Sequence, residues 1–363
     1  MSAYGWYTIH NVHDTLPERM SSMKAAVWRG KEKIAIESRD LPELPPGEVL
    51  LRIRTAGICG TDLTIYQGKF DPRRCVPPLV PGHEMCGVIE RLGRGVEGWS
   101  VGERVVADPL IACGQCYACH HGFPHVCASL QLLGIDRDGG FAEYAAAPAG
   151  RLHRLPEGIS DVDGAIVEPV AVAVHDVRRG QLATGDTALV VGGGPIGLLI
   201  GLVARSAGAR RVAVSEINGH RREVARCLGL QTYLPTDEDF RERVRADFDG
   251  VGPDIVFDAT GSAPGYQSAV ESVRVRGRIV QVGIPKGAVE LDLRRLNFAE
   301  ITIVGTRVYE PVDIVTAIGL LAGGRVATAG FVSTHGLAEC GSLLAQLSGG
   351  SSELMKPVLV ISR

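Results

Sequence analysis

Four cysteines lie close together in the segment CGQCYACHHGFPHVC, residues 113–127. They are separated by two, two and seven intervening residues: Cys113, Cys116, Cys119 and Cys127. This spacing lets four thiolates converge tetrahedrally on one zinc ion. Because four protein ligands leave no open position, the expected role of this zinc is structural. The alternatives are an iron–sulfur site, a redox pair or a nucleic-acid-binding ribbon, but the basic residues that a ribbon needs are missing around the loop. The nearby histidines are expected at the surface: His120, His121 and His125.

A second set of metal-ligand types is spread along the chain. Cys59 in GICGTDL, His83 in PGHEMCG and Glu168 in VEPVAVAVH each stand next to a glycine or proline, outside a helical pattern. Three such ligands of mixed type leave the fourth position of a zinc ion free for a substrate. Glu84, beside His83, is an alternative to Glu168 as ligand, or could exchange with it. Taken singly, each residue type is more often inert, as a small buried cysteine, a hydrogen-bonded histidine or a surface glutamate.

A glycine-rich turn follows a short apolar run in TALVVGGGPIGLLIGLV. Gly192, Gly194 and Gly197 form the pattern G-x-G-x-x-G between a predicted strand and a predicted helix, where backbone N–H groups can meet a pyrophosphate. Glu216 ends the next predicted strand, where a carboxylate accepts hydrogen bonds from a ribose 2′-hydroxyl and repels a 2′-phosphate. The sequence therefore favours NAD over NADP. Arg221 could stack on adenine, serve a phosphorylated cofactor or be solvated, and the glycines alone could serve packing.

The predicted elements around these residues form two patterns. From Met23 to about residue 60, apolar and polar residues alternate between Gly and Pro, which is typical of short antiparallel strands. From about Gly180, apolar runs alternate with helix-length segments, at 254–261, 277–283 and 301–306, which indicates a parallel sheet covered on both faces. The last 55 or so residues read as helix then strand and could return to the first domain. The predicted class is α/β, and 363 residues with 45% hydrophobic residues favour two domains.

Charge and composition exclude several partners. The chain has 38 basic and 41 acidic residues, so it offers no basic field for nucleic acid or an anionic membrane. No apolar run reaches the roughly 18 residues of a membrane span, and residues 1–22, read as an N-terminal extension, lack the pattern of a secretion signal. We therefore expect a cytoplasmic protein, in which clustered cysteines indicate metal or redox chemistry rather than disulfides.

The order of the quoted segments resembles the zinc-containing medium-chain dehydrogenase/reductase family of the alcohol dehydrogenase type. The resemblance rests on GICGTDL, PGHE, the four-cysteine loop, GGGPIGLL and FDATG, and covers nearly the whole chain from Met23. EPVAVAVH resembles the branch of polyol (sorbitol), butanediol and threonine dehydrogenases. The resemblance implies a GroES-like catalytic domain at 23–170, a Rossmann NAD-binding domain at 171–308, and a return to the catalytic domain at 309–363.

The resemblance also implies roles for single residues. Cys59, His83 and either Glu84 or Glu168 would hold a catalytic zinc directly or through water, with Asp62 orienting His83. Thr61 matches the hydroxyl that takes the proton of the alcohol. This chain has Thr64 where many relatives have a histidine that continues the proton relay, so the route beyond Thr61 stays open. Further positions match the nicotinamide side of the cofactor cleft: Ile196, Val282 and Gly283. Three aromatic residues would either line the substrate pocket or only pack: Tyr66, Phe70 and Tyr309.

The function implied is that of an NAD-dependent oxidoreductase with one catalytic and one structural zinc per chain. It would transfer a hydride between NAD and a secondary alcohol in a polyol, sugar, cyclitol or vicinal diol. The alternatives are an L-threonine 3-dehydrogenase-like activity or a biosynthetic ketone reductase. A non-catalytic zinc-binding module is disfavoured, because Cys59, His83 and the glycine turn are all present. Relatives suggest a homodimer or homotetramer, joined through the nucleotide-binding domain, and a small-molecule alcohol or ketone as the other partner.

Overall fold

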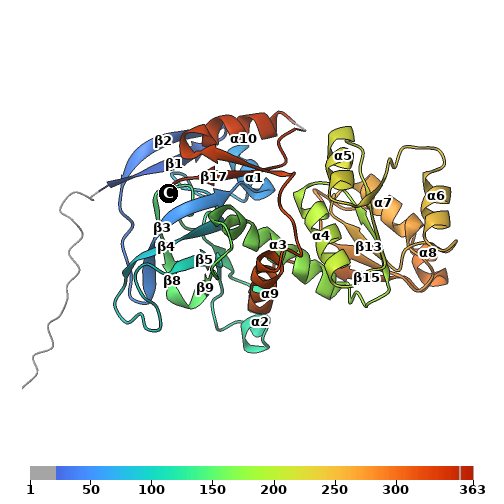
Figure 1. Ribbon diagram of the computed structural model, residues 1–363, viewed down its shortest axis with the longest axis horizontal. Coiled ribbons are helices and arrows are strands. Elements are labelled where there is room, and N and C mark those ends of the chain that lie inside the picture. Colours follow the sequence, from blue (N-terminus) through green and yellow to red (C-terminus); the bar gives the residue numbers. More distant parts are fainter. Residues whose placement is uncertain (1–21, 351–352, 363) are drawn as a thin grey trace, which may run out of the picture.

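The structure is a computed structural model that describes residues 22–350 and 353–362. Of the extension expected at residues 1–22, all but Ser22 lies outside the described residues, and Ser22 begins the first strand. Figure 1 shows two parts side by side, one built on a mixed sheet of the N-terminal and C-terminal segments and one on a parallel sheet of the middle segment. The α/β class predicted from the sequence is confirmed.

The first part is built around β3, Glu48–Gly57, whose ten residues are mostly buried and which has strands on both of its edges. β3 pairs antiparallel with β4, β8 and β17, so the last strand of the chain lies beside one of the first. The sheet runs β16-β17-β3-β4-β5-β9, with β8 also on β3. Its other strands are β4 (Glu84–Leu92), β5 (Arg104–Ala107), β8 (Tyr144–Pro148), β9 (Leu152–Arg154), β16 (Val332–Gly336) and β17 (Lys356–Val360). Two separate antiparallel pairs accompany it: β1 (Ser22–Gly30) with β2 (Lys33–Asp40), and β6 (Leu110–Ile111) with β7 (Gln131–Leu132).

The second part is a six-stranded sheet in the order β12-β11-β10-β13-β14-β15, and all of its pairs are parallel. This is the strand order of doubly wound dinucleotide-binding folds. The strands are short and rich in Val and Ile, as strands covered on both faces require: β10 (Thr187–Val191), β11 (Arg211–Ser215), β12 (Gln231–Tyr233), β13 (Ile255–Asp258), β14 (Arg278–Gln281) and β15 (Thr302–Gly305). Its helices are α4 (Pro195–Ser206), α5 (Gly219–Cys227), α6 (Phe240–Asp247), α7 (Ala263–Ser272) and α8 (Leu293–Phe298).

Helix α3, Asp161–Arg179, lies between the two parts in Figure 1 and contacts β4 of the first, α4 of the second and α9. Its first turn is capped by the Ser160 side chain, which accepts a hydrogen bond from the Asp163 backbone N–H. The domain boundary expected between residues 170 and 171 falls inside this helix. One continuous element therefore belongs to the packing of both parts.

The remaining helices cover the first part or connect its strands. They are α1 (Gly60–Tyr66), α2 (Tyr117–His120), α9 (Pro311–Ala322) and α10 (Cys340–Ser348), with one-turn 3₁₀ helices η1 (Pro124–Val126), η2 (Ala149–Arg151) and η3 (Leu337–Glu339). α9 packs on α3, whereas α10 contacts α1 and β2. The C-terminal segment thus runs from the boundary of the two parts back into the first sheet.

Candidate active site

Cys59, His83 and Glu84 come together where two chain segments meet. Cys59 caps the N-terminus of α1, and His83 immediately precedes β4, which Glu84 begins. One possible ligand atom from each lies within 4.8 Å of the other two. His83 and Glu84 are buried, while Cys59 is half-buried. The family resemblance placed these residues in one site, although their positions in the sequence give no distance between them. The fold brings them together.

Asp62 joins the Cys59 and His83 segments. One of its carboxylate oxygens accepts a hydrogen bond from the Cys59 N–H at 2.8 Å, and the other accepts one from the Gly82 N–H at 3.2 Å. The second oxygen also lies 3.8 Å from Nδ1 of His83. Burial raises the pKa of Asp62, although His83 opposes this shift. The carboxylate is therefore held in place by the two backbones that it aligns.

The electrostatics of the site fit a cation. Burial lowers the pKa of His83, but Cys59, Asp62 and Glu168 together outweigh burial and raise it well above its usual value. Nδ1 of His83 is also buried without a hydrogen-bond partner in the described part of the chain. An imidazole next to a thiol and carboxylates is the donor set that zinc prefers.

Lys356 on β17 is a site residue that the sequence reading missed. Its ammonium group, 3% exposed, donates to both carboxylate oxygens of Glu84 and to the Ile58 carbonyl at 3.0 Å. The two residues are 272 positions apart, so no local motif links them. The available signal was a lysine within the apolar strand MKPVLV, because a buried charge requires a partner. Glu84 is consequently neutralised by an ammonium group.

Glu168 approaches the site from α3. We expected it outside a helix because proline follows it, and this is wrong: α3 continues through Pro169 because its apolar residues are buried on both sides. Glu168 lies outside the compact group of Cys59, His83 and Glu84, but it is near enough to interact electrostatically with His83 and Glu84. Burial raises the pKa of Glu168 to about 7.

The aromatic residues differ in burial. Tyr309 is fully buried next to Glu168, and burial raises the pKa of its hydroxyl well above the usual value. Tyr66 is also buried, whereas Phe70 is half-buried and lies under the Arg74 guanidinium. The positions of Tyr66 and Tyr309 in the hydrophobic core agree with the packing alternative. Thr61 is half-buried on α1, two residues from Cys59.

We expect Lys356→Met either to lower the free energy of unfolding or to turn the Glu84 carboxylate toward the metal. Removing the ammonium group leaves a buried carboxylate unpaired, which costs about 3–5 kcal/mol in the free energy of unfolding unless Glu84 turns to the metal. Denaturant unfolding measures the first effect, and X-ray absorption of the metal-loaded variant detects an added oxygen ligand. Lys356→Arg keeps the charge and serves as the control. Unchanged stability together with unchanged coordination would show that the pair does not restrain Glu84.

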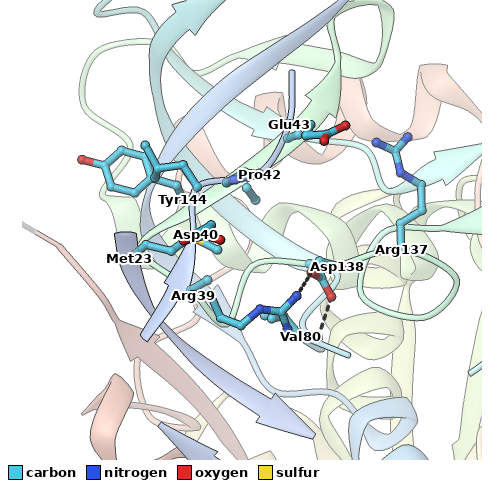
Figure 2. A pocket seen from close by; sticks show the side chains of 14 residues that line it. Met23, Arg39, Asp40, Pro42, Glu43, Val80, Arg137, Asp138 and Tyr144 are labelled. Carbon is cyan, nitrogen blue, oxygen red and sulfur yellow. Dashed lines mark hydrogen bonds and ion pairs between the residues drawn. The ribbon is translucent and has the colours of Figure 1, made fainter. Parts of the chain in front are cut away.

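The segment that ends in His83 is held in place by hydrogen bonds with residues 138–141. Figure 2 shows Asp138 between Val80 and Arg39; its carboxylate accepts from the Val80 N–H at 2.8 Å. The backbone N–H groups of 139–141 donate to the carbonyls of 80–82 at 2.7–3.0 Å. Gly82 has a φ of +95°, and a Cβ there would lie 2.4 Å from the Phe141 ring. The cavity of about 340 Å³ in Figure 2 is lined by Val80, Asp138 and Gly139 among others, and no predicted site residue lines it.

The glycine turn has the conformation that its pattern predicts. Gly192 has a φ of +101°, and Gly194 caps α4. A Cβ on Gly197 would lie 1.9 Å from the Gly192 carbonyl oxygen, so only glycine allows this close approach of helix and strand. Glu216 follows β11 and accepts from the Gly193 N–H at 2.7 Å, while Nη1 of Arg221 lies 3.8 Å from it. The predicted turn, acid and arginine therefore lie together.

Two cavities open at this turn. The larger, of about 660 Å³, is lined by Gly192, Gly194, Glu216 and Arg221. The other, of about 330 Å³, is lined by the turn and by the first part of the molecule: Cys59, Glu84, Lys356, Gly194, Ile196, Gly197 and Arg221. This second cavity brings the metal-ligand group and the expected cofactor turn to one space. Val282 and Gly283 follow β14, and their backbone N–H groups donate to the Asp258 carbonyl at 3.0 and 2.8 Å; they do not line either cavity.

The four-cysteine loop also converges. The sulfurs of Cys113, Cys116, Cys119 and Cys127 all lie within 4.8 Å of one another. Backbone N–H groups, that of Ala128 foremost, lower the pKa of Cys116 to about 6, which favours the thiolate that a metal ligand requires. His120 and His121 are exposed as expected, but His125 is buried because the loop folds it against α3 and α9.

Fold and site together define a two-domain dehydrogenase architecture, with a metal-ligand group and a dinucleotide turn facing one cavity. Two family models match the chain: the alcohol dehydrogenase GroES-like domain at residues 45–157 and the zinc-binding dehydrogenase domain at residues 195–333. The chain belongs to the zinc-binding alcohol dehydrogenase family. This confirms the resemblance and the GroES-like and Rossmann architecture expected from the sequence.

Two curated relatives and one solved structure indicate which branch of this family the chain resembles. The chain is 43% identical to 2-dehydro-3-deoxy-L-galactonate 5-dehydrogenase of Pseudoalteromonas atlantica, over 90% of this chain and 96% of the relative. It is 35% identical to L-galactonate-5-dehydrogenase of Escherichia coli, over 87% and 92%. A Sinorhizobium meliloti protein described as a zinc-binding dehydrogenase and solved with NADP superposes with a TM-score of 0.88 at 30% identity, covering 94% of this chain and 99% of that one.

The chain is therefore an oxidoreductase of the alcohol and polyol dehydrogenase type, as the sequence predicted, and it acts on secondary alcohols with a nicotinamide cofactor and zinc. None of the helices in the described segments has both the length and the apolar character needed to cross a membrane.

Proposed function

We propose that this protein oxidises the C5 hydroxyl of a six-carbon sugar acid of the galactonate type and reduces NAD. The observation that carries the proposal is the cavity lined by Cys59 and Glu84 on one side and by the glycine turn on the other. It offers a place where a substrate hydroxyl beside the metal ligands can face a nicotinamide ring. The substrate class comes from the two relatives named above, both of which act at C5 of galactonate-type acids.

We assign the metal ligands as Cys59, His83 and Glu168. Glu84 lies nearer to Cys59 and His83, but Lys356 neutralises its carboxylate, and we propose that Glu84 acts as an exchange ligand. A bound zinc supplies Lewis-acid chemistry that lowers the pKa of an alcohol. Asp62 fixes the relative position of the Cys59 and His83 segments. Thr61 would accept the proton of the substrate hydroxyl as its own hydroxyl proton passes outward, and a bound nicotinamide would take the hydride from the carbon that bears this hydroxyl, so that the alcohol becomes a ketone.

A substrate panel followed by NADH absorbance tests the proposal. The panel holds L-galactonate, 2-dehydro-3-deoxy-L-galactonate, sorbitol, 2,3-butanediol and L-threonine. We expect kcat/KM to be highest for the two sugar acids. A preference for L-threonine or butanediol would replace the proposed substrate class, and absence of NADH with all five after zinc is restored would favour a non-catalytic module.

We propose NAD rather than NADP because the Glu216 carboxylate stands at the end of β11, beside the larger cavity. The NADP in the Sinorhizobium meliloti structure belongs to that protein. Arg221 also lines this cavity, where it can contact the adenosine, and Ile196, Val282 and Gly283 remain our proposed nicotinamide-side positions.

Glu216→Ala is expected to reduce the preference for NAD over NADP by about 10- to 100-fold in kcat/KM. A hydrogen bond to a charged group contributes about 1.5–3 kcal/mol, and repulsion of the 2′-phosphate is lost as well. Steady-state kinetics with both cofactors measures the ratio. Glu223→Ala removes an exposed carboxylate from the nearby α5 and should leave the ratio unchanged. An unaltered ratio in Glu216→Ala would exclude this residue as the determinant.

We further propose a homodimer that forms through β15. This strand is the edge of the parallel sheet, and apolar side chains near it are exposed, including Ile284, Phe298 and Ile303. An open strand edge with exposed apolar residues favours pairing with another copy. Light scattering of the purified chain should give the mass of a dimer or of a tetramer built from dimers, and a monomer would contradict the proposal.

We also propose a zinc content, a domain division and a location for this protein. One structural and one catalytic zinc per chain follow from the four-cysteine loop and the Cys59 group. The domain division at 23–170, 171–308 and 309–363 remains our working description, with α3 shared between the first two. A cytoplasmic location is supported by the four loop cysteines, which a reducing compartment keeps available as thiolates.

A further inference from the structure

A third cluster of possible metal ligands lies away from the proposed active site, where the four-cysteine loop meets α3 and α9. One ligand atom each from His175, Glu310 and Asp313 lies within 4.8 Å of the other two, the same limit that the four loop cysteines and the group of Cys59, His83 and Glu84 meet; His125 is not in this compact set. His175 and Asp313 are buried, and Glu310 is half-buried. A cavity of about 250 Å³ is lined by His125, His175 and Glu310 among others.

A separate observation concerns His125, which the four-cysteine loop contributes. Its side chain is 9% exposed, and Nδ1 is buried without a hydrogen-bond partner among the described residues. This nitrogen lies 3.8 Å from Oε1 of Glu310, too far for a hydrogen bond. Its ring stands edge-on to that of His175, with 5.1 Å between the centroids. A buried nitrogen without a partner is costly unless something binds it.

His175 is oriented as metal-binding histidines usually are. Its Nδ1 lies 2.9 Å from Oδ2 of Asp313, which also accepts the Glu310 backbone N–H at 2.9 Å. If Nδ1–H donates to this fixed carboxylate, the lone pair is on Nε2. A carboxylate behind an imidazole sets its tautomer and makes it a better ligand. Asp313 does not line the cavity, so it serves to orient His175.

Arg178 already supplies one positive charge to this cluster, and it contacts one oxygen of each of the two carboxylates. It donates to Oδ1 of Asp313 and lies 3.4 Å from Oε2 of Glu310, whereas Oε1 of Glu310 faces His125. The two carboxylates and one guanidinium leave a net negative charge. Arg179, which also lines the cavity, lies 3.3 Å from the Gly305 carbonyl and makes no ion pair with either carboxylate.

We propose that His125, His175 and Glu310 form a third site for a divalent transition metal of the zinc type, oriented by Asp313. Two imidazole nitrogens and one carboxylate oxygen are a set that zinc, cobalt and nickel accept, with further positions left to water. The site contains no thiolate and opens into a cavity, so it binds metal more weakly than the four-cysteine site. Occupancy joins the four-cysteine loop to α3 and α9. This inference does not depend on the proposed substrate or on catalysis.

The test is binding of added Zn²⁺ and Co²⁺ to the full-length protein after its two expected zinc sites have been filled and excess metal removed. Calorimetry should show one further Zn²⁺ per chain. Co²⁺ bound there should give weak ligand-field absorption without the sulfur charge-transfer bands of cysteine sites. His125→Ala and Glu310→Gln should each weaken this binding by at least about 10-fold, and Asp313→Asn by about 10- to 100-fold.

His121→Ala is the matched control, because it removes an exposed histidine four residues away in the same loop. It should leave the third binding event intact. The proposal is overturned if no further metal binds to the filled protein, or if binding persists at wild-type strength in both His125→Ala and Glu310→Gln. Loss of the event in His121→Ala alone would assign the metal to the loop surface instead. Circular dichroism of each variant confirms that the fold is kept, and His175→Gln provides a second disruption of the site.

Discussion

Cys59→Ala is expected to lower kcat/KM for alcohol oxidation by at least about a thousandfold while the fold is kept. Cys59 is half-buried at the N-terminus of α1, faces the cavity shared with the glycine turn and belongs to the compact group with His83 and Glu84. Losing the thiolate removes the open metal site, whose Lewis-acid contribution of several kcal/mol corresponds to about three powers of ten in rate.

Metal analysis gives the second readout for this variant. We expect about two zinc ions per wild-type chain and about one in Cys59→Ala, since the four-cysteine loop is untouched. Cys227→Ala removes an exposed thiol elsewhere and should match the wild type in both measurements. Full activity of Cys59→Ala, or equal zinc content in the two variants, would exclude Cys59 as a ligand of the catalytic metal.

Cys116→Ala is expected to lose stability together with metal. The Cys116 sulfur lies 3.5 Å from that of Cys119 and 3.8 Å from that of Cys127, so it stands centrally in the set. Small structural zinc sites bind with about 10–16 kcal/mol, and that free energy contributes to folding. We expect a loss of about 4 kcal/mol or more in the free energy of unfolding, which thermal and denaturant unfolding detect.

The contrast between the two variants separates the two proposed metals. Cys59→Ala should unfold close to the wild-type midpoint, whereas Cys116→Ala should unfold earlier and retain about one zinc at the other site. Chelation followed by unfolding provides an independent comparison without mutation. If Cys116→Ala were as stable as wild type, the loop would be held by its backbone contacts alone.

Sequence patterns correctly predicted the features that depend on residues close together in the chain. Alternation predicted the strands β1, β2 and β3, and the spaced apolar runs corresponded to β13, β14 and β15. The glycine pattern predicted the turn before α4, because a Cβ on Gly197 would collide with the Gly192 carbonyl. The cysteine spacing likewise predicted convergence of four sulfurs. In each case the residues that carry the signal are close in sequence.

The missed features depend on contacts between distant segments. Lys356 pairs with Glu84 because β17 returns to the edge of β3. No local sequence pattern near either residue indicates this ion pair. Pro169 suggested that Glu168 lies outside a helix, but the packing of α3 carries the helix through it. His125 was expected at the surface, yet α3 and α9 cover it. These positions were set by tertiary packing, which overrides local preference.

The continuity of α3 restricts how the cofactor cleft can open. One nineteen-residue helix contacts β4 on one side and α4 on the other, so the chain cannot bend at residue 170 without breaking helical hydrogen bonds. If the two parts rotate relative to one another, the connections that could bend are the helix end near Gly180 and residues 306–310, between β15 and α9. Tyr309, which touches Glu168, lies in that second hinge. Cofactor-driven closure would therefore move a side chain against the proposed metal ligand, and the geometry of the reacting centre would report whether the cleft is open or shut.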